Sequence, residues 1–357
     1  MKVFRIHARL IPICCLAALV LAGGAAVTCS RLHTGHRPGG VIAVAATPLT
    51  GDSGAHIYLI DPRTGRWRQL TAGPGDDYGP VWSRGGERLA FWSLRQGGYA
   101  EAYVIDRKGN AEHRLTTSDY NKRDLAWSRQ GDALLYVAER ATAQGPVEEL
   151  ILHPLTGTPV SICSGPGLAL PSMSPLEDTI AVLALVAGTW QVYTLQPSTA
   201  PACPVMFDNV VWSQRWSPTD RLLALQVGRT GSKPHFDIGL LDPAAGTVRP
   251  LTGEPTDEVD PAWSPDGTAV AYLAHPADSG GPSSLCLAFL DGRKSITLVP
   301  PGMLRGASWS PCGGYLVYLQ EDYDGVTDAW VIEAKAGALP RRLPRKGNIW
   351  DAAWSPK

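Results

Sequence analysis

The hydrophobic and polar positions of this chain repeat with a period of about 45 residues. Seven and nine residues after the start of each repeat the chain is apolar, as at Leu89 and Phe91 or at Val270 and Tyr272. Alternation of this kind predicts a strand with one preferred face. Each repeat starts with a large side chain followed by Ser, here called the anchor, and the anchors are Trp82, Trp127, Met173, Trp216, Trp263, Trp309 and Trp354.

Turn residues divide each repeat into four short strands. The fullest turn is Ser264-Pro265-Asp266-Gly267, where Pro suits the first corner and Gly the last position of a hairpin turn. A third strand ends in a turn-forming residue such as Asp61, and a fourth closes on a Leu-Thr pair such as Leu251-Thr252. Four strands in about 45 residues are typical of a propeller blade, so we expect an all-β fold.

One repeat also resembles a known family. Trp263-Ser264-Pro265-Asp266-Gly267, followed by Val270-Ala271-Tyr272, resembles the WD-like repeat of TolB-type propellers. The resemblance extends over residues 41–357 and implies a β-propeller with a role in envelope protein interactions. Similar repeats occur in the N-terminal propellers of prolyl oligopeptidase-type enzymes. Met173 is the one anchor that replaces Trp.

The two ends of the repeat region complement each other. Residues 41–71 supply only three strands, and Gly347 to Lys357 supply a lone first strand. Pairing these segments would complete a ring and remove its exposed edges. We therefore expect a β-propeller of seven blades, closed by the C-terminal strand.

The N-terminus differs from the rest of the chain. Lys2, Arg5 and Arg9 precede an uncharged stretch from Leu10 to Ser30. We expect residues 1–30 to be a signal peptide or a membrane anchor that forms a hydrophobic helix, residues 31–40 a linker, and residues 41–357 the propeller. The leader could be retained, cleaved, or lipidated at Cys29, and each of these exports the propeller to the periplasmic or extracellular face. A cytosolic protein with a hydrophobic N-terminal strand is the other alternative.

The net charge of the repeat region limits the kinds of partner that we expect. The first 40 residues hold five of the 32 Lys and Arg and none of the 33 Asp and Glu, so the remainder (27 against 33) is about six negative. Nucleic acid is not an expected partner, because its binding needs a basic face.

The four cysteines beyond the leader, at positions 163, 203, 286 and 312, are expected as separate thiols. We expect a monomer that binds the membrane through its N-terminus.

Candidate site residues cluster where the innermost strands would begin. Asp124, Asp260 and Asp351 each stand three residues before an anchor, which predicts that they approach the mouth of the central channel. A mixed charged and aromatic rim is typical of a peptide or polar-ligand site. Carboxylates there could also hold a cation, or be solvated rim groups. The expected rim is Asp77, Tyr78, Arg123, Asp124, Asp260, Arg305, Trp350 and Asp351.

The sequence contains few catalytic signals. It has no Gly-x-Ser-x-Gly elbow and no zinc-binding Cys-x-x-Cys pair. We expect a non-enzymatic scaffold that binds an envelope protein or peptide at the channel mouth, with no catalytic residue, metal or cofactor. The alternatives are a metal-assisted hydrolase or lactonase that uses the channel, and a sensory or regulatory ectodomain.

Overall fold

The computed structural model describes residues 38–49, 54–143, 145–197, 211–229, 235–276 and 281–357. These residues belong to one compact unit, His36–Lys357. Within these ranges the regular elements are β-strands, and no α-helix is present. The same ranges contain no helix with the length and apolar character needed to cross a membrane. The expected leader helix, and with it most of the linker, lie outside the described residues.

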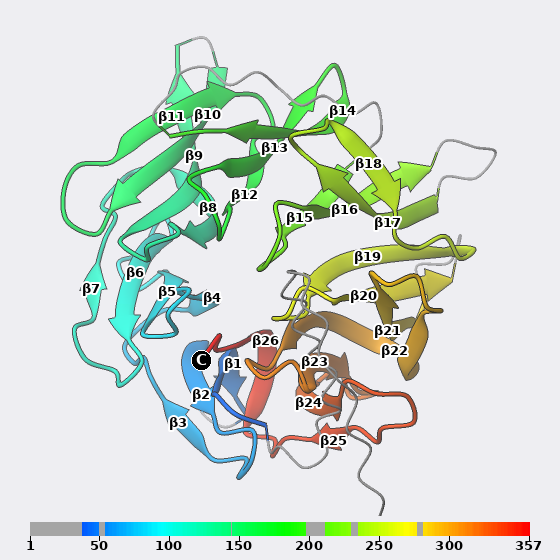
Figure 1. Ribbon diagram of the computed structural model, residues 1–357. Helices are drawn as coiled ribbons and strands as arrows, with labels where there is room; N and C mark the ends of the chain where they lie inside the picture. The colour runs from blue at the N-terminus through cyan, green and yellow to red at the C-terminus, as the bar shows by residue number, and fades with distance from the viewer. Residues whose placement is uncertain (1–37, 50–53, 144, 198–210, 230–234, 277–280) are drawn as a thin grey trace, which may run out of the picture. The chain divides into compact units, whose positions relative to one another are not determined.

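The strands form antiparallel sheets that follow the chain (Figure 1). The sheet that joins the two ends has the order β26 (Gly347–Trp354), β1 (Ile42–Pro48), β2 (His56–Ile60) and β3 (Trp67–Gln69). The next sheet is β4 (Asp77–Trp82), β5 (Arg88–Ser93), β6 (Glu101–Asp106) and β7 (His113–Arg114). It is followed by β8 (Asn121–Trp127), β9 (Ala133–Thr142), β10 (Gly145–Pro154) and β11 (Val160–Gly165).

The second half of the chain continues the pattern with two variations. A three-stranded sheet contains β12 (Ala169–Met173), β13 (Ile180–Val186) and β14 (Thr189–Leu195). The next has β15 (Val211–Trp216), β16 (Leu223–Arg229), β17 (His235–Asp242) and β18 (Thr247–Pro250). The last runs through β19 (Thr256–Trp263), β20 (Ala269–Pro276), β21 (Ser283–Phe289), β22 (Ile296–Trp309), β23 (Tyr315–Glu321), β24 (Thr327–Glu333) and β25 (Arg341–Arg342). Its long strand β22 is both the fourth strand of one repeat and the first of the next.

Both faces of the second strands are buried, which corrects the expectation of one preferred face. In β5, Leu89 and Phe91 pack with residues of β1 and β2, whereas Ala90 and Trp92 pack with residues of β8 and β9. Each sheet therefore lies between two neighbours, and the small residue between the two large ones allows the next sheet to come close.

Each anchor ends the first strand of its repeat, and the anchor tryptophans join neighbouring repeats. The Trp127 indole Nε1 donates to the Val81 carbonyl at 2.9 Å, and Trp263 Nε1 donates to the Arg215 carbonyl at 3.0 Å. In both pairs the acceptor immediately precedes the anchor of the previous repeat. The anchor indoles are buried as well, so they contribute apolar contact and a directional bond together.

A β-bulge recurs in the first strands, just before the anchor. The pairing register shifts between Arg123 and Ala126 in β8, and again between Val259 and Ala262 in β19. The residue three positions before the anchor has a positive φ in five repeats, at Gly79, Asp124, Leu170, Asp260 and Gly306. Such bulges re-aim side chains and locally change the alternation of faces. They determine which residues reach the site described next.

Candidate functional site

A cavity of about 660 Å³ lies between first strands from four repeats. Its walls come from β4, β8, β22 and β26, together with parts of β5 and β23. We call it the mouth cavity. Of the expected rim residues, it is lined by Tyr78, Arg123, Asp124, Arg305, Trp350 and Asp351.

Two carboxylates of the mouth cavity are held by backbone groups of the following sheet. Asp351 Oδ2 accepts from the Gly79 amide at 3.2 Å, and Asp124 Oδ2 accepts from the Leu170 amide at 3.1 Å. Both aspartates stand three residues before their anchor. The two donors, Gly79 and Leu170, occupy that same position in the repeat that follows each aspartate. These bonds orient the carboxylates and cross between sheets, so both Asp residues are positioned by the fold.

Two guanidinium groups share the cavity with these carboxylates. Arg123 donates to the Leu168 carbonyl at 2.8 Å and pairs with Glu148, while Arg305 pairs with Glu321 at 2.7 Å. Both side chains remain accessible, with 42% of Arg123 and 57% of Arg305 exposed. The glutamates hold the guanidinium groups in place and leave them open to a ligand carrying carboxylate or phosphate oxygens.

Aromatic groups complete the lining. Trp350 is 52% exposed, an unusual state for a large apolar side chain, and its Nε1 donates to Thr47 Oγ1 at 2.9 Å. The pKa of Tyr78 is raised by burial, with a further increase from the charge of Asp76. The Tyr78 phenol therefore stays protonated and can donate a proton or a hydrogen bond.

Asp260, although exposed, is not among the residues that line the mouth cavity. Its charge acts with that of Asp124 on Arg215 of β15, an arginine that the sequence analysis did not select. The Arg215 side chain is accessible, yet surrounding protein atoms lower its pKa by desolvation, and the two aspartates oppose this shift. The sequence does mark Arg215 as unusual, because the residue before each of the other anchors is apolar or Ser.

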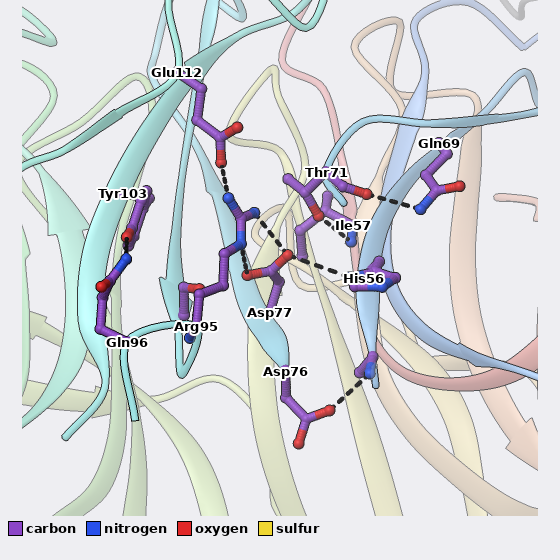
Figure 2. Close-up of polar contacts among 12 residues, drawn as sticks. His56, Ile57, Gln69, Thr71, Asp76, Asp77, Arg95, Gln96, Tyr103 and Glu112 are labelled. Carbon is purple, nitrogen blue, oxygen red and sulfur yellow. Dashed lines mark hydrogen bonds and ion pairs between the residues drawn. The ribbon is translucent and has the colours of Figure 1, made fainter. Parts of the chain in front are cut away.

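Asp77 lies away from the rim in a buried network (Figure 2). Its carboxylate accepts from Arg95 at 2.8 and 3.1 Å and lies 3.5 Å from His56 Nδ1, and Arg95 also pairs with Glu112. The side chain of Asp77 is fully buried. Asp77 stands five residues before Trp82, and its side chain points toward the neighbouring sheet. The network of its contacts connects β2, β4 and the loop after β5.

The described part of the chain has no group of three or more His, Cys, Asp or Glu side chains placed to hold a metal ion. In this same part, Cys163, Cys286 and Cys312 are free thiols, and Cys203 lies outside it. That the protein uses no metal or cofactor remains a prediction.

Comparisons with known proteins identify the fold. No protein-family model matches the chain. An 81-residue segment is 31% identical to the uncharacterized peptidase YuxL of Bacillus subtilis, covering 23% of this chain and 12% of that protein. The chain thus spans about an eighth of the length of this curated relative.

Solved structures resemble most of the chain. TolB of Acinetobacter baumannii aligns with a TM-score of 0.55 at 19% identity, covering 88% of this chain and 83% of its own. Oligogalacturonate lyase of Vibrio parahaemolyticus aligns with a TM-score of 0.65 at 13% identity, covering 84% and 92%. A puromycin-hydrolyzing peptidase of Mycobacterium tuberculosis aligns with a TM-score of 0.64 at 14% identity, covering 85% and 53%. The fold is therefore an all-β, TolB-like propeller.

These findings correct the expected function. The interpretation as a non-enzymatic binding scaffold was wrong, and so was the expectation that the protein is not an enzyme. The proteins that share the fold include a lyase and a peptidase, and the curated sequence match is also to a peptidase. The alternative of a metal-assisted hydrolase or lactonase that uses the channel agrees better with the comparisons, in that it makes the propeller an enzyme.

Proposed function

We propose that this protein is a propeller enzyme that cleaves acidic sugar chains in the mouth cavity. The observation that carries the proposal is the grouping of two oriented carboxylates, two accessible guanidinium groups and an exposed tryptophan around about 660 Å³. Guanidinium groups bind carboxylates through paired hydrogen bonds, and a tryptophan face suits the apolar face of a sugar ring.

One structural match consists almost entirely of propeller. The aligned region covers 92% of the oligogalacturonate lyase chain. Nearly all of the lyase thus corresponds to the propeller, which supports an activity located there. An activity located within the propeller itself is the one that this chain's own cavity can support.

Different residues of the cavity carry out the steps of an elimination reaction. Arg123 and Arg305 bind sugar carboxylates and stabilise the charge that develops on the carboxylate next to the reacting carbon. Asp124 or Asp351 takes the proton from that carbon. The electrons of the broken C–H bond form a C=C bond, the glycosidic C–O bond breaks, and Tyr78 protonates the leaving oxygen.

The finer architecture belongs to the same proposal. Seven blades closed by the C-terminal strand are supported by the sheet order β26-β1-β2-β3 and by the packing of each first strand on the next, including β22 on β26 and β26 on β4. We also propose that residues 1–30 export the protein and associate it with the membrane, that residues 31–40 link this segment to the propeller 41–357, and that the propeller acts as a monomer.

The test is an activity assay on the full chain with oligogalacturonate, in which unsaturated products are detected by their ultraviolet absorbance. We expect Asp124→Asn or Asp351→Asn to lower kcat by about 100-fold or more, because one of them is the proton acceptor. Thermal midpoints should change little, since Asn keeps a side-chain oxygen that can accept the same backbone hydrogen bond. Asp291→Asn, on the exposed turn after β21, is the control and should keep full activity.

Two results would reject the proposal. The first is no cleavage of any acidic oligosaccharide, including alginate and hyaluronate fragments, by a chain whose folding is verified. The second is cleavage that persists at the original rate in both aspartate variants.

A further inference from the structure

A polar junction recurs between neighbouring sheets. In three repeats the Thr of the closing Leu-Thr pair accepts a hydrogen bond from a backbone amide 14 residues earlier, at 2.8 to 2.9 Å. The residue before that amide interacts, by contact or through its charge, with the residue five positions before the next anchor. The three pairs are His56 with Asp77, Glu101 with Lys122, and Asp237 with Glu258.

Two of these junctions combine opposite charges. Glu101 and Lys122 lie 3.4 Å apart, and Arg114 also lies 3.3 Å from Glu101. At the first junction, Asp77 is bound by Arg95 as described above. Burying a carboxylate is costly unless such a partner compensates it, so these junctions are balanced.

The third junction combines two acids. Glu258 of β19 is 0% exposed, and Asp237 of β17 is also buried. Neither oxygen of Glu258 accepts a hydrogen bond of normal geometry from the residues that the structure describes. The nearby Thr252 hydroxyl instead accepts from the Ile238 amide at 2.9 Å. A buried carboxyl group whose oxygens accept no hydrogen bond ionises only at a high cost, and a second acid near it raises that cost.

The surroundings of Glu258 favour its neutral form. The pKa of Glu258 is raised to about 7, mainly by burial and also by the charges of Asp237 and Glu254, against a lowering effect of Thr252 and the Ile238 amide. From β20 and β21, Tyr272 and Cys286 face the same group, and burial raises the pKa of both. Next to it along β19, Asp257 lies 3.8 Å from His235.

We propose that the junction of β17 and β19 is a pH-sensitive switch: Glu258 is protonated in the folded chain in acid and, when ionised in alkali, pushes β19 away from β17. Strand β19 links Glu258 to residues that act on the cavity region. Asp260, two residues further along β19, occupies the left-handed position of the bulge and acts electrostatically on Arg215. Ionisation of Glu258 therefore loosens the strand that carries Asp260.

The sign of the effect follows from proton linkage. Between the ordinary pKa of 4.5 and the folded value of about 7, the folded chain keeps a proton that the unfolded chain has released. Stability therefore falls as pH rises through this interval and levels off above it. Most buried carboxylates that are paired with cations have the opposite dependence.

The test is the thermal midpoint of the full chain between about pH 5 and pH 9. We expect the midpoint to fall toward neutral pH in the natural chain, and Glu258→Gln to remove this fall. Glu258→Lys, which reproduces the arrangement of Glu101 and Lys122, should remove it too and give a higher midpoint than the natural chain above pH 8.

Two control variants isolate the group responsible. Glu87→Gln removes an exposed carboxylate and should keep the fall. His235→Gln removes the neighbouring histidine, which lies 3.8 Å from Asp257, and should also keep the fall. Retention of the full pH dependence in Glu258→Gln, or its loss in His235→Gln, would overturn the proposal.

A second measurement does not depend on any variant. Amide hydrogen exchange, corrected for its intrinsic pH dependence, should show β19 losing protection between pH 6 and about pH 8, while the equivalent strand β8 does not. Equal behaviour of the two strands would contradict a switch at Glu258.

Discussion

At the scale of single residues, the anchor tryptophans show why one side-chain type recurs. An indole fills the space between two sheets and also donates a hydrogen bond to the preceding repeat, which a Phe or Leu cannot do. Met173 shows the consequence, because it keeps the volume without a donor, and no equivalent bond is formed at that position among the described residues. The two contributions can be separated by substitution.

Trp263 is the position at which to separate them. Trp263→Phe keeps most of the apolar contact but leaves the Arg215 carbonyl without its donor, so we expect a loss of about 1 to 3 kcal/mol in the free energy of unfolding. Trp263→Ala also leaves a cavity and should cost about 3 to 5 kcal/mol. Chemical denaturation measures both. Trp350→Phe, at an exposed indole, is the control, and a loss there equal to that of Trp263→Phe would refute the argument.

At the scale of elements, the hairpin after each anchor depends on the anchor's Ser. Its hydroxyl accepts from the backbone amide five residues later, at 3.0 Å from Ala269 to Ser264 and at 3.0 Å from Ala133 to Ser128. The hydroxyl thus pairs with a backbone amide of the hairpin that water does not reach. This explains why Ser is kept even in repeats whose turn lacks the Pro-Asp-Gly sequence.

Ser264→Ala tests this function of the hydroxyl. The substitution leaves the buried Ala269 amide unpaired, and we expect the free energy of unfolding to fall by about 1 to 3 kcal/mol. The matched control is Ser161→Ala on the exposed face of β11, which should change stability by less than about 0.5 kcal/mol. Equal effects of the two changes would show that the hydroxyl contributes nothing specific.

Strand positions could be predicted from the sequence because each blade repeats the same chemistry at fixed distances from its anchor. The placement of Asp77 could not, since the bulge between Tyr78 and Val81 interrupts the alternation on which such placements depend. The continuous strand β22 was also missed, because the pattern alone suggests a break between one repeat and the next. Arg215 was not predicted, because it differs from the equivalent residues of the other repeats only in its side chain, and its charged neighbours come from other sheets.

At the scale of the whole molecule, the ends of the described chain meet in one sheet. Strand β26 pairs with β1 from Trp354 opposite Ile42 to Gly347 opposite Pro48. Trp354 Nε1 donates to the Gly39 carbonyl at 2.8 Å, and the Ser355 amide donates to the Val41 carbonyl at 2.8 Å. Pairing between residues this distant in sequence forms slowly, because a long loop must close first.

A chain that ends at Lys346 tests whether this strand completes the proposed ring. Removal of residues 347–357 exposes the edge of β1 and deletes Asp351 from the mouth cavity, so we expect loss of cooperative unfolding and a tendency to aggregate. A synthetic peptide of residues 347–357 added in trans should restore both the thermal transition and the cleavage of acidic sugars. The same peptide with Trp354→Ala should not, because it lacks the indole that bonds to Gly39. A truncated chain that melts at the original temperature would mean that the C-terminal strand is dispensable and that the closed ring is the wrong architecture.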